Sequence, residues 1–378
     1  MTPDSLDPLF GPQAAFRHFL SRTNQKANIG AEVGTLLNVL DPSELPDDVI
    51  VLDAGCGEGK LSSLAYAKIR SHSPDLTYIG IDPSQHMLVL FCEEFRRNQP
   101  ANYRVIHGRF FDRPEFSIDD LAATVTDGTP KGEQTIDALR EQNPDLFAAK
   151  PLADLKGKVG ILFCAHTLYY AQDMAKAWQD SRDMLSPNGF CIFVHQSATS
   201  QMHKLRKKYS ESPLTLRQPD GEPNCADHMT TASGTQIPII DYSSDLFFPE
   251  DFKTQFALLR ELLTAQTPKS DWARAAQEKG IDSASFAATC GVLQYILRQE
   301  FGAMDQNLSG FLTETEELLD YNPKLDGKPR LFIRESIVLA ATNERTIGHL
   351  KNSVAVYQQE ALKGAFLRYA AGQMMTKT

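Results

Sequence analysis

The sequence predicts an α/β fold with a doubly wound, mostly parallel seven-stranded sheet, a helical N-terminal cap and helical C-terminal insertions. Two observations carry this prediction. Apolar runs of strand length alternate with helical stretches between residues 49 and 194, and such crossovers between parallel strands are right-handed. The first run ends in a glycine-rich turn, Leu52 to Lys60, and the second ends in an acid, Asp82. A strand, glycine turn, helix, strand and acid in this order are typical of a nucleoside-binding βαβ unit.

The individual elements follow from apolar spacing and from helix breakers. Residues 14–20 and 29–40 carry apolar side chains at helical intervals, and Asp41-Pro42 stops the second helix before the first strand. Ser84 is placed to cap the helix that follows Asp82. Strands are expected at 49–51, 77–82, 103–107, 159–164, 190–194, 237–242 and 330–341. Further helices are expected at 84–98, 174–185, 250–263, 284–300 and 344–374, with a turn at 186–189.

These elements suggest four segments. Residues 1–46 would form the cap, and residues 47–245 would form the core, which a polar insertion at 117–156 interrupts. Residues 246–341 would place helices between the last two strands. Residues 342–378 would form a C-terminal helix that either packs on the core or pairs with a second copy, so monomer and homodimer both stay open.

The glycine turn separates two classes of nucleotide ligand. Gly55, Gly57 and Gly59 let the backbone bend tightly and approach a ligand where a Cβ atom would collide. Dinucleotide sites use G-x-G-x-x-G with a pyrophosphate at the helix N-terminus, whereas here Lys60 stands in place of the third glycine. Asp53 would repel a pyrophosphate and suits a cationic ligand. The alternative is a turn that only joins a strand to a helix, and the acid in the next strand argues against it.

The turn and the acid resemble motif I and the following strand of class I S-adenosylmethionine-dependent methyltransferases, which have a Rossmann-like fold. The resemblance implies S-adenosylmethionine as the cofactor. Asp53 would lie near the methionine ammonium, the three glycines would shape the turn, and Asp82 would bind the ribose hydroxyls. The other residues expected at the cofactor are Cys56, Pro83, Met87, Phe111, Asp112 and Ala165.

The composition limits the classes of molecule that the protein is expected to bind. Lys and Arg number 38 against 48 Asp and Glu, which gives a net charge of −10, and there is no long basic run. Nucleic-acid binding depends on clustered basic residues that neutralise phosphates, so neither DNA nor RNA is expected as a substrate. The six cysteines include no C-x-x-C pair, which fits a reducing compartment, and no signal peptide or membrane span is evident. We therefore expect a cytoplasmic protein with a small-molecule partner, no membrane contact and no metal centre.

The methyl acceptor is expected at the carboxyl ends of the strands, where ligands of doubly wound sheets bind. His166 follows the fourth strand and can act as a general base or orient the acceptor, unless it only caps the next helix. Of Tyr169 and Tyr170, at most one would line the pocket, where its ring can hold a cationic amine. His195, at the end of the fifth strand, can edge the pocket or make a structural hydrogen bond.

Four further segments resemble the histamine N-methyltransferase family. They are Phe-Arg-His-Phe-Leu at 16–20, Leu-Tyr-Tyr at 168–170, Lys-Leu-Arg-Lys-Lys-Tyr at 204–209 and Phe-Leu-Thr-Glu-Thr at 311–315. That family methylates small amines. The resemblance therefore implies a small nitrogen acceptor, covered by a lid formed from the N-terminal cap and the C-terminal insertions.

The acceptor residues of that family carry over only in part. Its acidic amine-binding residue falls on Gln25, and its glutamine after the fourth strand falls on His166. Its pocket tryptophans fall on Met202 and Arg206, and an asparagine of its last strand falls within about one residue of Arg334. In addition, Phe19 would face the acceptor.

The loss of a carboxylate and the gain of two arginines, Arg206 and Arg334, suggest an acceptor that carries an anion, such as an amino acid or a natural-product intermediate. The alternative is that both arginines face solvent or pair with acids. Two other functions stay open from the residues alone. One is methylation of a hydroxyl or carboxylate oxygen, which needs the same positioning, and the other is binding of the cofactor without methyl transfer.

Overall fold

The computed structural model describes residues 12–40, 49–98, 102–108, 110–111, 155–167, 174–197, 199–209, 238–297, 301, 306–319 and 328–375. The insertion predicted at 117–156 therefore lies almost wholly outside the described residues, as do Asp112, Tyr169 and Tyr170. Within the described ranges, no helix has the length and apolar character needed to cross a bilayer.

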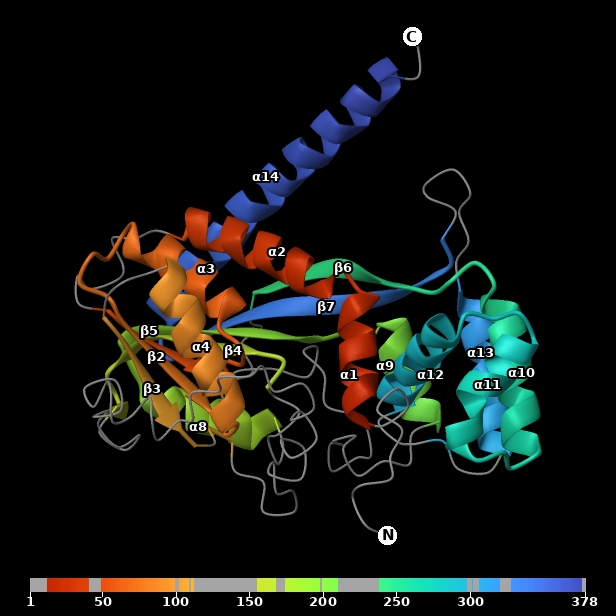
Figure 1. Ribbon diagram of the computed structural model, residues 1–378. Coiled ribbons are helices and arrows are strands. Elements are labelled where there is room, and N and C mark those ends of the chain that lie inside the picture. Colours follow the sequence, from red (N-terminus) through yellow and green to blue (C-terminus); the bar gives the residue numbers. More distant parts are fainter. Residues whose placement is uncertain are drawn as a thin grey trace.

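A seven-stranded sheet forms the centre of the molecule, in the order β3-β2-β1-β4-β5-β7-β6 (Figure 1). The strands are β1 (Ile50–Ala54), β2 (Thr77–Asp82), β3 (Tyr103–His107), β4 (Val159–Ala165), β5 (Leu185–Gln196), β6 (Ile239–Phe247) and β7 (Arg330–Ala341). Strands β1 to β5 pair in parallel, whereas β7 runs antiparallel to both β5 and β6. This confirms the predicted doubly wound, mostly parallel sheet. The strand order reverses between β1 and β4, and ligands of such sheets bind at the carboxyl ends beside this switch point.

Strand β5 differs from the prediction at its start. The sequence predicts a turn at 186–189 and a strand from Phe190. In the structure Leu185 already pairs with Val159, and regular pairing resumes at Phe190 after a shift in register. The residues between bulge out of the ladder, because Pro187 has no N–H with which to continue it.

Two layers of helices cover the sheet. The helices of these layers are α2 (Gln25–Val39), α3 (Lys60–Arg70), α4 (Gln85–Asn98), α8 (Met174–Met184) and α14 (Glu344–Met375). One face packs against α2, α3, α4 and α14, and the other face packs against α8 through Ala177 and Trp178. The sequence assigns α2 to a separate cap, but its apolar side chains Ile29, Val33 and Leu36 are buried in the core of the sheet. The predicted cap of α4 is present, since Met87 N donates to the hydroxyl of Ser84 at 3.3 Å.

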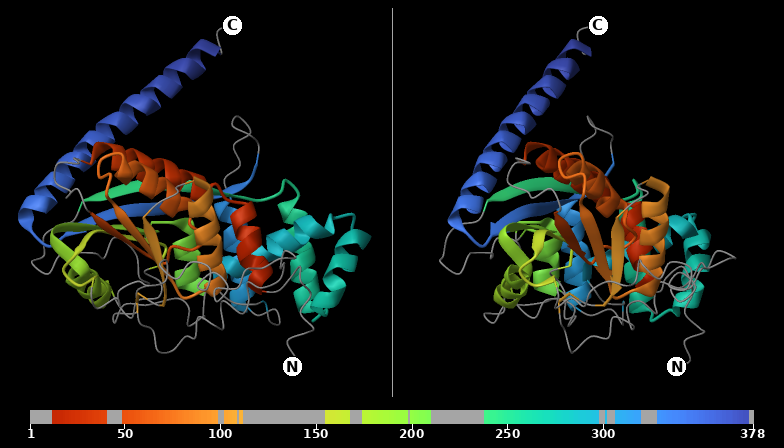
Figure 2. Two further views of the ribbon diagram at one scale, coloured as in Figure 1. Left: turned by 60° about the vertical axis from the view of Figure 1, so that its left-hand side comes forward. Right: turned by 90° about the vertical axis from the view of Figure 1, so that its left-hand side faces the viewer.

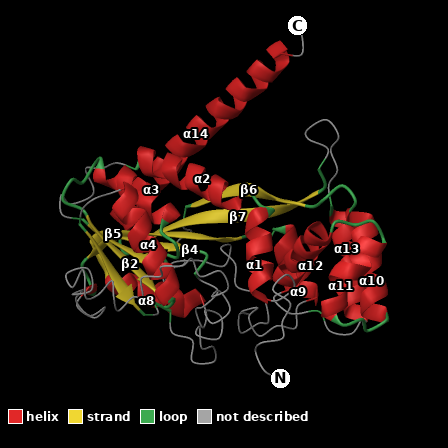
Figure 3. Cartoon of the chain, in the orientation of Figure 1, coloured by secondary structure: helices red, strands yellow, loops and turns green. Residues whose placement is uncertain are grey.

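A second apolar cluster lies at the end of the molecule away from β3, where helices gather beyond β6 and β7 (Figures 1 and 3). The elements there are α1 (Pro12–Ser21), α9 (Gln201–Tyr209), α10 (Phe252–Thr264), the 3-10 helix η6 (Lys269–Asp271), α11 (Trp272–Glu278), α12 (Ser283–Leu297) and α13 (Gln306–Leu318). Leu246 of β6 and Leu331 of β7 join this cluster, so the last two strands connect the two cores.

The C-terminal helix α14 packs on the core at its start and then runs away from the body of the protein (Figure 2). Ile347, Leu350, Val354 and Tyr357 are buried at helical spacing, so this part of the predicted C-terminal helix packs on the domain. The hydroxyl of Tyr357 also donates to Glu32 of α2. The first half of this helix is therefore part of the domain core.

Candidate functional site

The glycine turn between β1 and α3 has two kinds of glycine. Gly55, Gly57 and Gly59 all have positive φ, of 80°, 55° and 81°. A Cβ atom on Gly55 would overlap the Thr167 methyl group, and one on Gly59 would lie 3.0 Å from Cδ2 of Phe91. A Cβ atom on Gly57 would meet nothing within 4 Å. Packing therefore requires two of these glycines, whereas Gly57 borders open space from which a ligand can approach the backbone.

Asp82 ends β2 and holds the turn. Gly57 N donates to Oδ2 at 3.0 Å, and Ser84 N donates to Oδ1 at 2.8 Å. Burial raises the pKa of Asp82, although these N–H groups and His107 act in the opposite direction. Each carboxylate oxygen keeps a second lone pair, so the group can still accept hydrogen bonds from the hydroxyls of a ligand.

Asp53 lies beneath the turn and is only 2% exposed. Its Oδ2 accepts hydrogen bonds from Oγ of Ser62 at 2.5 Å and from the hydroxyl of Tyr78 at 2.7 Å. The pKa of Asp53 is raised to about 6, mainly because the carboxyl group is buried. The hydrogen bonds from Ser62 and Tyr78 act to lower this pKa, and the charge of Asp82 acts to raise it. Asp53, which the sequence predicts to lie near a cationic group, is thus a buried carboxylate whose hydrogen bonds come from protein side chains.

At the end of β4 the chain makes an unusual bend. His166 has a φ of 57°, a conformation that non-glycine residues rarely adopt and that is often found at functional sites. Its N–H donates to the carbonyl of Val194 at 2.8 Å, which anchors the bend to β5. The bend brings Thr167 against Gly55, and it brings Nε2 of His166 to 2.9 Å from Oε1 of Glu335.

Glu335 is a site residue that the sequence reasoning missed. It lies on β7 with 0% exposure, although an isolated carboxylate is rarely buried. Gln25 Nε2 donates to its Oε1, and Ser244 Oγ donates to its Oε2 at 3.2 Å. On the other side it pairs in register with Gln196 of β5. Gln25, His166 and Glu335 therefore meet from three distant parts of the chain.

The register of β7 corrects the prediction for the last strand. The resemblance points to Arg334 with an uncertainty of one residue, but the side chain of Arg334 is exposed while that of its neighbour Glu335 is buried. Successive side chains of a strand point to opposite faces, so a shift of one residue exchanges the two. The available signal was that Glu335 is the one acid in β7.

Arg206 is also placed differently from the prediction. Its side chain is 5% exposed, and its guanidinium donates to Ile296 O at 2.8 Å, to Tyr295 O at 3.3 Å and to Oε1 of Gln196 at 3.0 Å. The group also lies 5.3 Å from the centre of the Tyr295 ring. These contacts join α9 to α12 and to β5, which is a structural use of the charge.

The remaining residues predicted for the acceptor and the cofactor lie in different parts of the structure. Phe19 and Met202 are buried in the second apolar cluster, where Phe19 stacks on Tyr295 at 4.2 Å. His195 is fully buried, and its partner in register is Ser336 and not Glu335. The residues expected at the cofactor that lie around the carboxyl ends of β1, β2, β3 and β4 are Cys56, Pro83, Met87, Phe111 and Ala165.

The turn and its acids fit an adenosine-type ligand with a positively charged group. Gly57 leaves room for the ligand, Asp82 has acceptor oxygens for ribose hydroxyls, and Asp53 adds a second carboxylate nearby. Two acids at this turn oppose a pyrophosphate and favour a cation. Among the described residues, no group of His, Cys, Asp and Glu side chains could hold a metal ion.

Several solved structures are similar to this chain at low sequence identity. No curated protein matches the sequence. Among solved structures, the YcgJ protein of Bacillus subtilis is 15% identical, covering 83% of this chain and 99% of that chain with a TM-score of 0.39. A putative methyltransferase of Bacillus halodurans is 12% identical, covering 81% and 99% with a TM-score of 0.41. A putative sarcosine dimethylglycine methyltransferase of Galdieria sulphuraria is 9% identical, covering 84% and 88% with a TM-score of 0.41.

The family assignment rests on the sequence itself. Residues 45–267, more than half of the chain, match the family described as Methyltransferase domain. The matched region includes the glycine turn, Asp82 and the β4 bend. The chain therefore belongs to this methyltransferase family and uses S-adenosylmethionine as its methyl donor.

Proposed function

We propose that the protein methylates a nitrogen atom of a small molecule at a site formed by His166 and Glu335. The observation that carries the proposal is their contact, in which Nε2 of the imidazole lies 2.9 Å from a carboxylate that is 0% exposed. S-Adenosylmethionine supplies an electrophilic methyl group on a sulfonium. The protein's own residues have to position an acceptor with an available lone pair and exclude water.

The charge of the site favours an amine. A buried carboxylate needs hydrogen-bond donors or a positive partner. Gln25 and Ser244 supply neutral donors to Glu335, and among the described ion pairs its partner is His166. An ammonium or a neutral N–H donor suits this site better than an anion. The two arginines that suggested an anionic acceptor do not support it, because Arg206 binds carbonyl oxygens and Arg334 is exposed.

The pair can also manage the proton that an amine must lose. Because Nε2 of His166 lies 2.9 Å from Oε1 of Glu335, the imidazole would take the proton of the acceptor on its other nitrogen, Nδ1. The nitrogen lone pair is then available for the methyl group, and the carboxylate stabilises the imidazolium. General-base catalysis of this kind contributes about 10²- to 10⁴-fold to the rate.

The resemblance to histamine N-methyltransferase supports a small amine. Gln25 and His166 stand at positions where that resemblance places acceptor residues, and Glu335 stands within one residue of a third. On this basis we propose that the helices of the second core enclose the acceptor. A hydroxyl acceptor is the second candidate, since the same pair can remove a proton from oxygen.

A paired screen tests the proposal. Primary and secondary amines, and alcohols of the same carbon skeletons, are incubated with S-adenosylmethionine, and S-adenosylhomocysteine and the methylated product are measured by mass spectrometry. Glu335→Gln should lower kcat/KM by about 10²-fold or more and leave S-adenosylmethionine affinity unchanged. Arg334→Gln is the matched control on the same strand and should behave as wild type. Products from the alcohols alone would establish O-methylation, and equal activity of the two variants would refute the role of Glu335.

A further inference from the structure

The first turn of α2 is fixed in place by the edge of the sheet. In the connection before α2, Phe247 N donates to Arg22 O at 2.7 Å and Asn24 N donates to Asp245 O at 3.3 Å. In return, Asp245 N donates to Oδ1 of Asn24 at 2.7 Å. The connection thus adds a short ladder to β6, so the residues that begin α2 have a defined position relative to the sheet.

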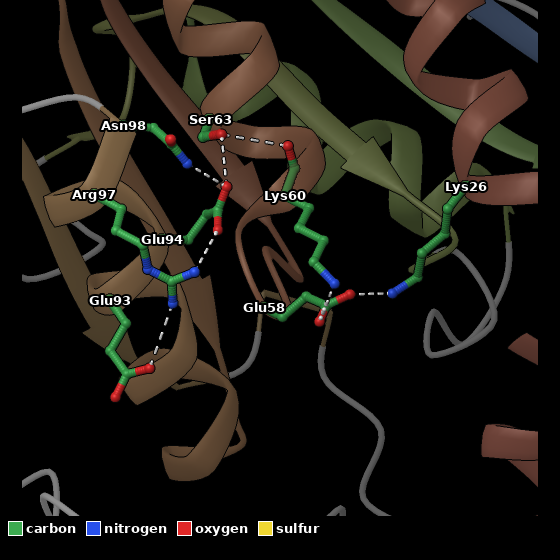
Figure 4. Close-up of polar contacts among 8 residues, drawn as sticks. All are labelled: Lys26, Glu58, Lys60, Ser63, Glu93, Glu94, Arg97 and Asn98. Carbon is green, nitrogen blue, oxygen red and sulfur yellow. Dashed lines mark hydrogen bonds and ion pairs between the residues drawn. The ribbon is translucent and has the colours of Figure 1, made fainter. Parts of the chain in front are cut away.

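Two successive residues of this turn contact two different parts of the candidate site. Gln25 donates to the buried carboxylate of Glu335, and Lys26 forms an ion pair with Glu58 of the glycine turn (Figure 4). Glu58 has a second cation, Lys60 of α3, at 3.2 Å. Burial acts to raise the pKa of Glu58, but its contacts with the two lysines lower it, so the carboxylate is ionised. Lys26 therefore links the turn to α2, whereas Lys60 belongs to the helix that the turn itself begins.

We propose that Lys26 is a positioning residue that ties the cofactor turn to α2 and, through Gln25, to Glu335. The ion pair between Lys26 and Glu58 sets the distance between the glycine turn and α2, whose Gln25 donates to Glu335. The proposal rests on the cofactor turn and on neither the identity nor the existence of a particular acceptor. It can therefore be tested even if the proposed function is wrong.

The position of Glu58 within the turn explains why a restraint matters there. Glu58 stands between Gly57 and Gly59, which have no side chains that could restrain the turn by packing into the core. Its carboxylate is 28% exposed and the Lys26 side chain is 51% exposed, so solvent screens the pair. The expected effect on S-adenosylmethionine affinity is accordingly modest, about two- to five-fold.

Two lysine variants separate this role from a general effect of charge. Lys26→Met and Lys60→Met each remove one positive charge beside Glu58, but only the first cuts the link to α2. Affinity for S-adenosylmethionine is measured by titration calorimetry, and hydrogen exchange of residues 22–30 and 331–337 is measured with and without the cofactor. Lys26→Arg serves as the conservative rescue variant.

The proposal expects that S-adenosylmethionine slows exchange in both segments of the wild-type protein and of Lys60→Met. In Lys26→Met this protection should be lost and the dissociation constant should rise about two- to five-fold, while Lys26→Arg should restore both. Identical behaviour of Lys26→Met and Lys60→Met would overturn the proposal. Absence of cofactor-dependent protection of residues 22–30 in the wild-type protein would overturn it as well.

Discussion

Replacement of Gly57 by alanine should separate cofactor binding from stability. At this position φ is 55° and a Cβ atom would meet no protein atom within 4 Å. Alanine in a left-handed conformation costs about 1–2 kcal/mol, and its smaller unfolded-state entropy returns roughly 0.4–1 kcal/mol. We therefore expect Gly57→Ala to lower the free energy of unfolding by only about 1 kcal/mol.

Gly55→Ala is the matched control. It has the same kind of backbone strain, with a φ of 80°, but its Cβ atom would overlap the Thr167 methyl group. Overpacking adds about 1–3 kcal/mol, so this variant should lose roughly 2–4 kcal/mol in total. Urea denaturation without cofactor measures both values.

Cofactor affinity completes the comparison. If the space beside Gly57 is where S-adenosylmethionine approaches the backbone, the added methyl group should raise the dissociation constant by at least about 10-fold, a loss above about 1.4 kcal/mol. Titration calorimetry measures this directly. Wild-type affinity in a folded Gly57→Ala protein would refute the assignment of the cofactor turn, and a stability loss equal to that of Gly55→Ala would refute the assignment of open space.

The other predictions concern buried charges. The pKa of Asp53 is about 6 in the folded protein and 3.8 in a model peptide, so between these pH values only the folded state keeps the proton. The contribution of this group to stability is therefore present below pH 4 and is lost as the pH rises through 6. As the pH rises from 4 to 7, the free energy of unfolding of Asp53→Asn should rise by roughly 3 kcal/mol relative to that of the cofactor-free wild type. Denaturation of both proteins across this pH range measures the difference. Arg206→Met should lower stability by about 2–4 kcal/mol, because it removes the buried hydrogen bonds from the guanidinium to the carbonyls of Tyr295 and Ile296, and should leave S-adenosylmethionine affinity unchanged. A stable Arg206→Met protein would contradict the structural role.

The cofactor half of the site could be predicted from the sequence because it is local. The turn from Gly55 to Gly59 and the acid Asp82 lie on adjacent strands joined by one helix, so spacing alone indicates their proximity. The sequence could not show which glycine faces protein and which faces ligand. That distinction depends on Thr167 and Phe91, which come from other elements.

The acceptor half could be predicted only in part because its contacts are distant and depend on register. The sequence pointed to Gln25 and His166, and in the structure the residue that contacts both is Glu335, one residue from the predicted Arg334. The face on which a strand residue points changes with every step, and an approximate resemblance cannot resolve a single step. Arg206 carried no sequence signal that its guanidinium would bind carbonyl groups of α12, since those partners are backbone atoms.

The two halves of the site also differ in how they must form during folding. The hydrogen bond between Gly57 and Asp82 joins residues 25 positions apart, whereas the bond between Gln25 and Glu335 spans 310 positions. Closing so long a stretch of chain is entropically costly, so local contacts tend to form first. A growing chain that has emerged only as far as β5 already has every strand around the cofactor turn, but it lacks Glu335, the carboxylate that we propose faces the acceptor. On the proposed role of Glu335, the chain would become able to bind the methyl donor before it could transfer the methyl group, and β7 would supply the residue that the transfer requires.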